Sequence, residues 1–138
     1  MNQNKIIFAS GKVSSKEIDR WGMTKSLNQA IKRGLRKLAI TGKYELWIDG
    51  NRDFGLAKDL KIPVTTIIDG DDLHWEISMA SIIAKVERDR EMIKLHKKHP
   101  KYNFAKHKGY GTLEHRNLIK KHGPSSEHRM SFLKKILA

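Results

Sequence analysis

A chain of 138 residues, of which 38% are hydrophobic, is long enough for one folded domain with its own core. It contains no cysteine, which excludes disulfides and thiolate zinc sites. The sequence shows neither a secretion signal nor an apolar run of the ~20 residues that a membrane span needs. We therefore expect a soluble protein of the cytoplasm.

The net charge of +13 lies mainly in the C-terminal part of the chain. Residues 85–138 hold 15 Lys and Arg against 5 Asp and Glu, together with six of the seven histidines. Such a basic region is typical of proteins that bind a polyanion, most often nucleic acid. A solvated basic surface explains the same charge equally well, so charge alone leaves both interpretations open.

The N-terminal half predicts three strands and a helix. The segment "KIIFASGKV", residues 5–13, is β-rich and leads into "SSKEID", which marks a loop or the start of a helix. Apolar residues recur with helical spacing through residues 25–38. The short β-rich runs over residues 44–48 and 63–68 each end in an acidic turn that contains glycine.

The C-terminal half predicts helices. Apolar residues indicate a long helix over residues 74–99, apolar at its start and basic at its end. Two short helices follow, one from Thr112 to a stop at Gly123-Pro124 and one from about Ser126 onward. The alternation of strands and helices favours an α/β fold in which strands 44–48 and 63–68 lie parallel.

Both of these strands end in aspartates. Asp49 follows the first, and Asp69, Asp71 and Asp72 follow the second. Ligand-binding and catalytic groups of open α/β sheets gather at the carboxyl ends of strands, where two such carboxylates can hold Mg²⁺. The alternative is that Asp-Gly pairs simply favour turns, and without other information that explanation is the stronger one.

Five segments change this balance: "LWIDGN", "GDD" after "PVTTII", "ISMASIIAKVERDR", "YNFAKHKGYGTLEH" and "GPSSEHRMSF". In this order and spacing they resemble the ribonuclease HII family, the type 2 ribonucleases H, over about residues 8–132. The resemblance implies a ribonuclease H-like α/β fold with a C-terminal helical extension. It also implies an endoribonuclease that hydrolyses RNA in RNA–DNA hybrids and at single ribonucleotides in duplex DNA, with Mg²⁺ or Mn²⁺ held by four carboxylates.

The resemblance assigns the metal site to two aspartates. Asp49 corresponds to the third carboxylate of the family and Asp71 to the fourth, so both are expected to be catalytic and to bind the metal. Asp69 and Asp72 flank Asp71 and leave open which of these three side chains faces the ion.

The resemblance also assigns substrate binding to the segment around Tyr110. In the family this tyrosine stacks on the sugar of the deoxynucleotide beside the ribonucleotide. Gly109 and Gly111 allow close backbone approach, and Lys106 and Lys108 can reach phosphates. The alternatives are a half-buried loop anchor for the tyrosine and a solvated surface for the lysines.

Three histidines and two tryptophans are assigned to structure. His107, His115 and His128 could look like metal ligands, but their spacing fits no tight cluster and imidazole is a poor ligand for Mg²⁺, so we expect phosphate contact or packing. Trp47 and Trp75 are expected in the core beside the acidic turns.

The chain departs from the family at its N-terminal end. Family members carry a "DExGRG" motif that supplies two further carboxylates and the loop that holds the 2′-hydroxyl, and this sequence lacks it. The resemblance therefore implies one partial ribonuclease HII domain over residues 1–138, with a basic helical part over about 85–138. It further implies an uncovered apolar edge at residues 5–13, and a missing N-terminal fragment as a partner beside the hybrid substrate.

Three functions stay open on the sequence. The first is a ribonuclease HII that is active only with its N-terminal part. The second is a non-catalytic module that binds RNA–DNA hybrids or junctions. The third is a basic α/β domain that binds nucleic acid nonspecifically, with its aspartates acting in turns only.

Overall fold

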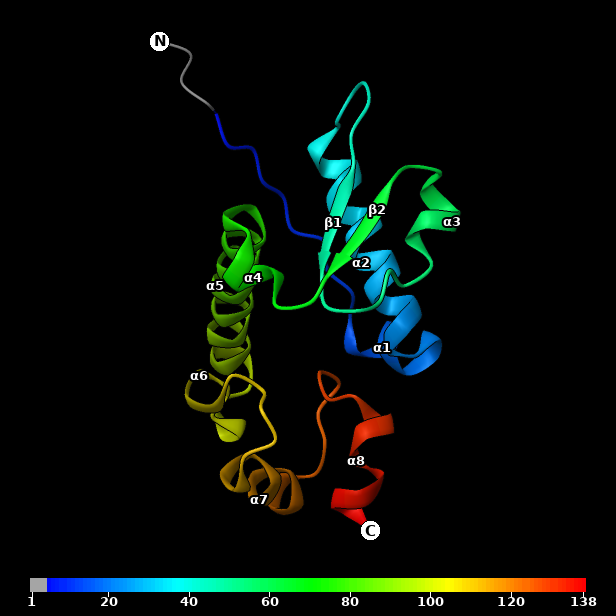
Figure 1. Ribbon diagram of the computed structural model, residues 1–138. Coiled ribbons are helices and arrows are strands. Elements are labelled where there is room, and N and C mark those ends of the chain that lie inside the picture. Colours follow the sequence, from blue (N-terminus) through cyan, green and yellow to red (C-terminus); the bar gives the residue numbers. More distant parts are fainter. Residues whose placement is uncertain (1–4) are drawn as a thin grey trace. The chain divides into compact units, whose positions relative to one another are not determined.

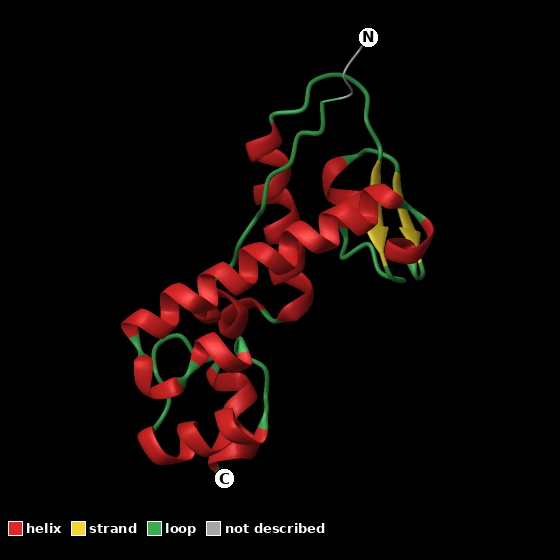
Figure 2. Ribbon diagram, turned by 90° about the vertical axis from the view of Figure 1, so that its left-hand side faces the viewer, coloured by secondary structure: helices red, strands yellow, loops and turns green. Residues whose placement is uncertain are grey.

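The computed structural model describes residues 5–138, which divide into two compact units. Unit 1 consists of the chain up to Val13 and of Trp21–Ile83, and unit 2 consists of Ser14–Arg20 and Ala84–Ala138. Most of the described elements are helices (Figure 2). Within residues 5–138, the helices fall short of the length and apolar character that crossing a membrane requires.

The elements follow one another along the chain in a mixed α/β order. They are α1 (Ser15–Trp21), α2 (Met23–Leu38), β1 (Leu46–Asp49), α3 (Leu56–Leu60), β2 (Val64–Ile67), α4 (Gly70–Leu73), α5 (Trp75–Lys98), the 3₁₀ helix η1 (Pro100–Tyr102), α6 (Phe104–His107), α7 (Leu113–His122) and α8 (Met130–Leu137).

The sheet of unit 1 pairs β1 with β2, which lie side by side and point the same way (Figure 1). The register runs from Leu46 opposite Val64 to Asp49 opposite Ile67. Residues 50–63, which include α3, form the crossover that parallel strands require. The predicted pair of parallel strands is confirmed, so the carboxyl ends of both strands lie at one edge of the sheet.

α2 is fixed in unit 1 by a buried polar side chain. Asn28 donates from Nδ2 to the Phe54 carbonyl oxygen at 2.9 Å and to Asp59 Oδ2 at 3.1 Å. Lys32 Nζ lies 2.6 Å from the same carboxylate, and its hydrogen bond is the main cause of the lowered pKa of Asp59. The predicted helix over residues 25–38 is confirmed, with a start two residues earlier at Met23.

The strand predicted over residues 5–13 is wrong, because residues 5–14 adopt neither helix nor strand. Side chains of α2 donate hydrogen bonds to two backbone carbonyl oxygens of this segment. Lys37 Nζ donates to the Ser10 carbonyl oxygen at 2.7 Å, and Arg33 Nη1 donates to that of Lys12 at 2.6 Å. A strand needs a neighbouring backbone as its partner, and these carbonyl groups bind side chains instead.

The same segment exposes apolar side chains at its start. Ile6, Ile7 and Phe8 are 53%, 68% and 64% exposed. The expected uncovered edge of a strand over residues 5–13 is therefore wrong, although these three apolar side chains are exposed.

The helices of unit 2 follow the predicted order. α5 confirms the predicted helix over 74–99. α7 begins after Thr112, whose Oγ1 accepts from the His115 amide at 3.2 Å, and ends before Gly123 as predicted. Most of the core of unit 2 comes from Tyr102, Phe104, Ile119 and Leu133.

The last helix begins later than predicted. α8 starts at Met130 instead of Ser126, because Asp19 of α1 caps it there. The Asp19 carboxylate accepts from the Met130 amide at 2.7 Å and from the Ser131 amide at 3.1 Å. An acidic side chain at a helix N-terminus satisfies amides that have no partner within the helix.

The expectation that Trp47 and Trp75 lie in the core is wrong. Their side chains are 38% and 61% exposed. Side chains alternate between the two faces of a strand, and Ile48, next to Trp47, is the buried one. Trp47 therefore lies on the opposite face, where its ring contacts the His74 ring edge-on at a centroid distance of 4.8 Å.

Candidate functional site

The first candidate region is the acidic edge, which we define as Asp49, Asp69, Asp71 and Asp72 at the carboxyl ends of β1 and β2. Asp49 is the last residue of β1, and its Oδ1 accepts a hydrogen bond of 2.9 Å from the Gly70 amide. This bond ties the end of β1 to the residue directly before Asp71. The structure thus brings Asp49 next to the backbone that carries the other three aspartates.

Gly70 leaves almost no room around this bond. A Cβ atom at this position would lie 2.8 Å from Ile77 Cδ1 and 3.4 Å from both Asp49 Oδ1 and Ile67 Cβ. Asp69, just before it, has a φ of 54°, in the left-handed region that non-glycine residues seldom adopt. This sharp turn places Asp71 and Asp72 in the first turn of α4.

The carboxylates of the acidic edge are exposed to solvent and suit a hard divalent cation. Mg²⁺ and Mn²⁺ prefer oxygen ligands, and Asp49 and Asp71 offer them. Among residues 5–138, however, no three or more His, Cys, Asp or Glu side chains are grouped closely enough to hold a metal ion. The donor chemistry therefore fits such an ion, but the described residues form no complete set of ligands for one.

A cleft of about 640 Å³ reaches Asp49 within unit 1. Five consecutive residues, 45–49, contribute the wall on the β1 side. Ile31 of α2 and a set of α5 residues line the rest of the cleft, namely Glu76, Ile77, Ala80 and Ser81. The cleft leaves Asp49 accessible alongside β1.

The second candidate region is the tyrosine loop, residues 108–112, between α6 and α7 of unit 2. Tyr110 is 60% exposed, and the Arg88 guanidinium carbon lies 5.9 Å from its ring centroid. Arg88 also donates from Nη2 to the Lys108 carbonyl oxygen at 3.4 Å. Gly109 has a φ of 81°, and a Cβ there would lie 3.3 Å from both Arg88 Nη2 and Met92 Sδ. The loop therefore lies directly on α5.

The two candidate lysines differ in their surroundings. Lys106 Nζ lies 2.8 Å from Glu114 Oε2, and Asn103 donates to Glu114 Oε1 at 2.8 Å. The hydrogen bond from Lys106, followed by that from Asn103, lowers the pKa of Glu114. The negative charge of Glu114 therefore neutralises the positive charge of Lys106. Lys108 has no ion pair of this kind within the described part of the chain. Lys108 is therefore the better placed of the two for a phosphate.

Arg129 is a candidate that the sequence analysis missed. Burial, and then the positive charge of Arg88, lower the pKa of Arg129, while Asp19 acts in the opposite direction. Guanidinium groups suit a phosphate backbone, and that of Arg88 lies 5.9 Å from the Tyr110 ring, whereas that of Arg129 lies 4.5 Å from the Phe132 ring. Residues 88 and 129 lie 41 positions apart, and no periodic pattern in the sequence relates them. Their interaction could therefore not be predicted from local sequence patterns.

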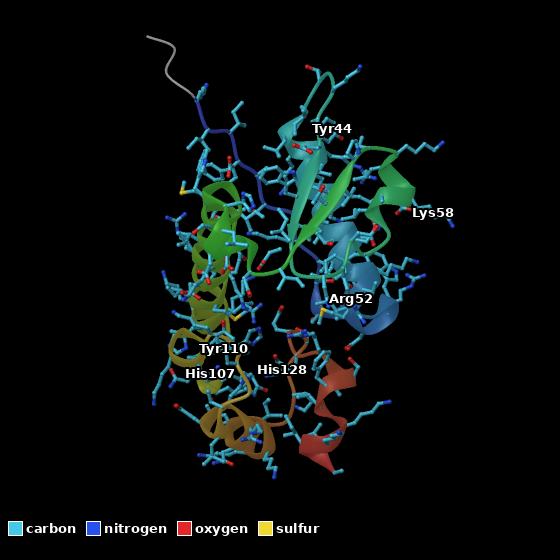
Figure 3. The ribbon with its side chains drawn as sticks, viewed as in Figure 1. Tyr44, Arg52, Lys58, His107, Tyr110 and His128 are labelled. Carbon is cyan, nitrogen blue, oxygen red and sulfur yellow. The ribbon has the colours of Figure 1, made fainter. Side chains whose placement is uncertain are left out.

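The three histidines come together in unit 2, close to the tyrosine loop (Figure 3). His107, His115 and His128 are buried, and their rings contact one another. The prediction of packing is confirmed. The expectation that the three histidines form no tight cluster is wrong, because their rings contact one another. Their ring nitrogens bind protein groups.

Comparisons with known proteins agree with the resemblance. A family model described as Ribonuclease HII matches residues 2–135. The Ribonuclease HII of Nitrosospira multiformis is 46% identical over 127 residues, which are 92% of this chain and 61% of the relative. That of Psychromonas ingrahamii is 44% identical over 138 residues, or 98% of this chain and 65% of the relative. That of Chromohalobacter salexigens is 41% identical over 124 residues, or 90% and 60%. The chain thus spans about 60–65% of the length of these relatives.

Proposed function

This chain belongs to the ribonuclease HII family, and from that premise we propose that it forms part of an endoribonuclease that hydrolyses RNA paired to DNA. The substrates proposed are RNA–DNA hybrids and duplex DNA with single embedded ribonucleotides. The observation that carries the proposal is the hydrogen bond from Gly70 to Asp49, because it ties one family carboxylate position to the residue directly before the other, Asp71.

Asp49 and Asp71 are proposed as catalytic residues that hold Mg²⁺ or Mn²⁺. Such an ion, when bound, supplies the positive charge that activates the attacking water and stabilises the leaving oxygen. The Gly70 amide fixes one oxygen of the Asp49 carboxylate, and among residues 5–138 no hydrogen bond to its second oxygen is present. The remaining ligands are proposed to come from an N-terminal family segment, which makes that segment a partner of the chain.

Tyr110 is proposed as the reader of the RNA–DNA junction. Its ring is exposed, and the backbone of its loop is fixed against α5. Arg88, Arg129 and Lys108 are proposed to bind phosphates around it, with Lys106 contributing once it leaves Glu114. An aromatic face supplies contact with sugar or base, while the cations supply affinity that does not depend on sequence.

The test is a cleavage and binding assay on a duplex with one embedded ribonucleotide, in Mg²⁺ or Mn²⁺. The 138-residue chain alone is expected to bind this duplex and cut it weakly. Addition of a family segment that carries "DExGRG" is expected to produce cutting at the 5′ side of the ribonucleotide. A DNA duplex of the same sequence is the control. Rapid cutting by the chain alone contradicts the shared metal site, and no cutting under any condition contradicts the proposed activity.

A non-catalytic hybrid-binding module is the second candidate function. It is favoured by the absence, within residues 5–138, of a complete group of metal-ligating side chains. The basic charge of residues 85–138 and the exposed Tyr110 serve either function. The same assay separates the two, because a binding module retains affinity but gives no cleavage when the N-terminal segment is added.

A further inference from the structure

The backbone around Tyr110 is held by three buried rings, which we call the histidine cluster: His107, His115 and His128. Their exposed fractions are 6%, 6% and 8%. The rings of His107 and His115 stack at a centroid distance of 3.9 Å, and the Nε2 atoms of His115 and His128 lie 3.1 Å apart. Figure 3 labels His107, His128 and Tyr110 in this part of unit 2.

The partners of His107 assign its proton. The Gly109 amide donates to His107 Nδ1 at 3.1 Å, so that nitrogen carries no hydrogen. His107 Nε2 lies 2.6 Å from the Tyr102 carbonyl oxygen, which can only accept, so Nε2 carries the proton. The ring is therefore neutral, and both of its nitrogens are satisfied.

The partners of His115 and His128 assign the other two protons. His115 Nδ1 lies 2.9 Å from the Tyr110 carbonyl oxygen, so Nδ1 donates and Nε2 is left as an acceptor. The Ser125 amide donates to His128 Nδ1 at 2.9 Å, so the proton of His128 lies on Nε2 and points to His115. The cluster thus consists of a hydrogen-bonded pair, His128 and His115, with the ring of His107 stacked on His115, and every ring proton has an acceptor.

The surroundings favour the neutral forms of His115 and His128. Burial lowers the pKa of His115, and burial followed by the charge of His115 lowers that of His128 to about 4. Among other titratable groups, His99 acts on His128, and Glu114 interacts with His107. A second proton on His115 would have to lie on Nε2, where it would face the Nε2–H of His128. Protonation therefore breaks the hydrogen-bonded pair.

The cluster holds the backbone on both sides of the Tyr110 ring. The His115 ring donates to the Tyr110 carbonyl oxygen. The His107 ring accepts from the Gly109 amide. The His107 carbonyl oxygen accepts from the Tyr110 amide at 2.9 Å. The side chain of Tyr110, in contrast, is exposed. We propose that His115 is a positioning residue, which fixes the Tyr110 carbonyl group so that the exposed ring meets nucleic acid in one orientation. This inference rests on the proposed function, because it concerns the proposed role of Tyr110 at an RNA–DNA junction.

Two substitutions of His115 separate positioning from general packing. His115→Asn places an amide donor near the position of Nδ1, whereas His115→Leu has a similar volume and no donor. The measurement is the affinity of the 138-residue chain for a duplex with one embedded ribonucleotide, divided by its affinity for a uniform hybrid. Stacking worth about 1–3 kcal/mol corresponds to a preference of roughly 5- to 150-fold. His115→Leu is expected to lose at least about fivefold of this preference, as is Tyr110→Ala, and His115→Asn is expected to stay within about twofold of the parent.

His122→Leu is the matched control, because His122 is exposed on the same helix as His115. It is expected to leave the preference unchanged. Equal preferences in the parent, His115→Leu and His115→Asn would overturn the proposal while leaving the proposed function intact.

Nitrogen NMR of the histidine rings tests the cluster without nucleic acid. The parent is expected to show His115 protonated on Nδ1, and His107 and His128 protonated on Nε2. The amide signals of Gly109 and Gly111 are expected to move in His115→Leu and to return towards the parent in His115→Asn. A His115 protonated on Nε2 would overturn the inference, even if His115→Leu does not fold. If the parent binds no duplex, the proposed function fails, and the ring and amide signals still decide whether His115 positions the loop.

Discussion

The amide of Gly70 donates a hydrogen bond of 2.9 Å to Asp49 Oδ1, across the parallel strands β1 and β2. One oxygen of Asp49 is therefore held by the backbone that leads into Asp71. A carboxylate fixed in this way keeps its orientation without the help of an ion, and its other oxygen stays free to bind one. This relationship makes Asp49 the better defined of the two proposed metal ligands.

Asp49→Asn and Asp71→Asn are each expected to abolish cleavage in the chain supplied with its N-terminal family segment. Asparagine keeps an oxygen that can accept from Gly70 but removes the negative charge that a divalent cation requires. Loss of a group that only orients a metal ligand lowers metal affinity or activity by about 10- to 100-fold, so loss of a ligand itself is expected to lower the cleavage rate by at least about 100-fold. Hybrid binding is expected to stay near the parent level. Cleavage at the parent rate by either variant would show that its residue holds no essential ion.

Tyr110→Ala and Lys108→Ala are expected to affect binding in different ways. Stacking by an aromatic ring depends little on salt, whereas a phosphate contact weakens as salt rises, because it releases counterions. Tyr110→Ala should reduce the preference for a junction over a uniform hybrid and leave the salt dependence unchanged. Lys108→Ala should weaken binding to both duplexes and flatten the salt dependence. Binding to the two duplexes across a salt series measures both effects, and a flattened dependence in Tyr110→Ala would contradict junction reading.

Glu114→Gln is expected to strengthen hybrid binding. The substitution removes the carboxylate that lies 2.8 Å from Lys106 and so frees this lysine for a phosphate. One additional phosphate contact steepens the dependence of log K on log salt by about 0.9 on duplex DNA. Glu127→Gln makes the same change in net charge at an exposed site and is the control. If both variants bind equally well, the gain comes from net charge and not from Lys106.

Gly109→Ala and Gly111→Ala form a matched pair in the tyrosine loop. Gly109 has a positive φ and packs against Arg88 and Met92, so alanine there is expected to lower the free energy of unfolding by about 1–2 kcal/mol. A Cβ on Gly111 meets no atom within 4 Å, so alanine there is expected to change stability by less than about 0.5 kcal/mol. Urea unfolding of both variants tests this difference. Equal destabilisation would mean that the loop does not lie on α5 as described.

Asp19→Asn is expected to destabilise unit 2 in a pH-dependent way. The hydrogen bond from the Ser131 hydroxyl contributes most to the lowered pKa of Asp19. The hydrogen bonds from the Ser131 and Met130 amides lower this pKa further. A carboxylate whose pKa is lowered by folding stabilises the fold fully above its unfolded pKa of about 4, and this contribution is lost as the pH falls through the folded pKa. The parent should therefore unfold at a higher urea concentration than Asp19→Asn at pH 7, and the gap should close below pH 4. Glu127→Gln is the control, and a gap that does not depend on pH would contradict the ionised cap.

Local patterns predicted much of the fold. The apolar periodicity of α2 and α5, the glycine stop of α7 and the β-rich runs of β1 and β2 all depend on residues close in sequence. The prediction for residues 5–13 failed because a strand depends on a neighbouring backbone. The prediction for Trp47 and Trp75 failed because burial depends on which face of an element is covered.

The candidate site was predictable only where a family motif marks it. Asp49, Asp71, Tyr110, Lys106 and Lys108 were assigned from such motifs, and their roles stay predictions. The structure adds the bond between Gly70 and Asp49 and the pairing of Lys106 with Glu114.

The family motifs include His107, His115, His128, Arg88 and Arg129, but they do not show that the histidine rings meet or that Arg88 acts on Arg129. The members of each group lie 8 to 41 positions apart along the chain, outside any single helical or strand pattern. The ring contacts of the histidines and the electrostatic influence of Arg88 on Arg129 follow from tertiary folding, which spacing alone does not reveal.

The bond between Asp19 and Ser131 has a consequence for how the protein is made. Unit 2 combines Ser14–Arg20 with Ala84–Ala138, so its first piece leaves the ribosome long before the helix that it caps. All residues of unit 1 have been synthesised by the time translation passes Ile83, and chains generally fold in the order in which complete units emerge. We therefore expect unit 1 to fold during translation, whereas the Asp19 carboxylate of α1 can form its hydrogen bonds only after Met130 and Ser131 have been synthesised.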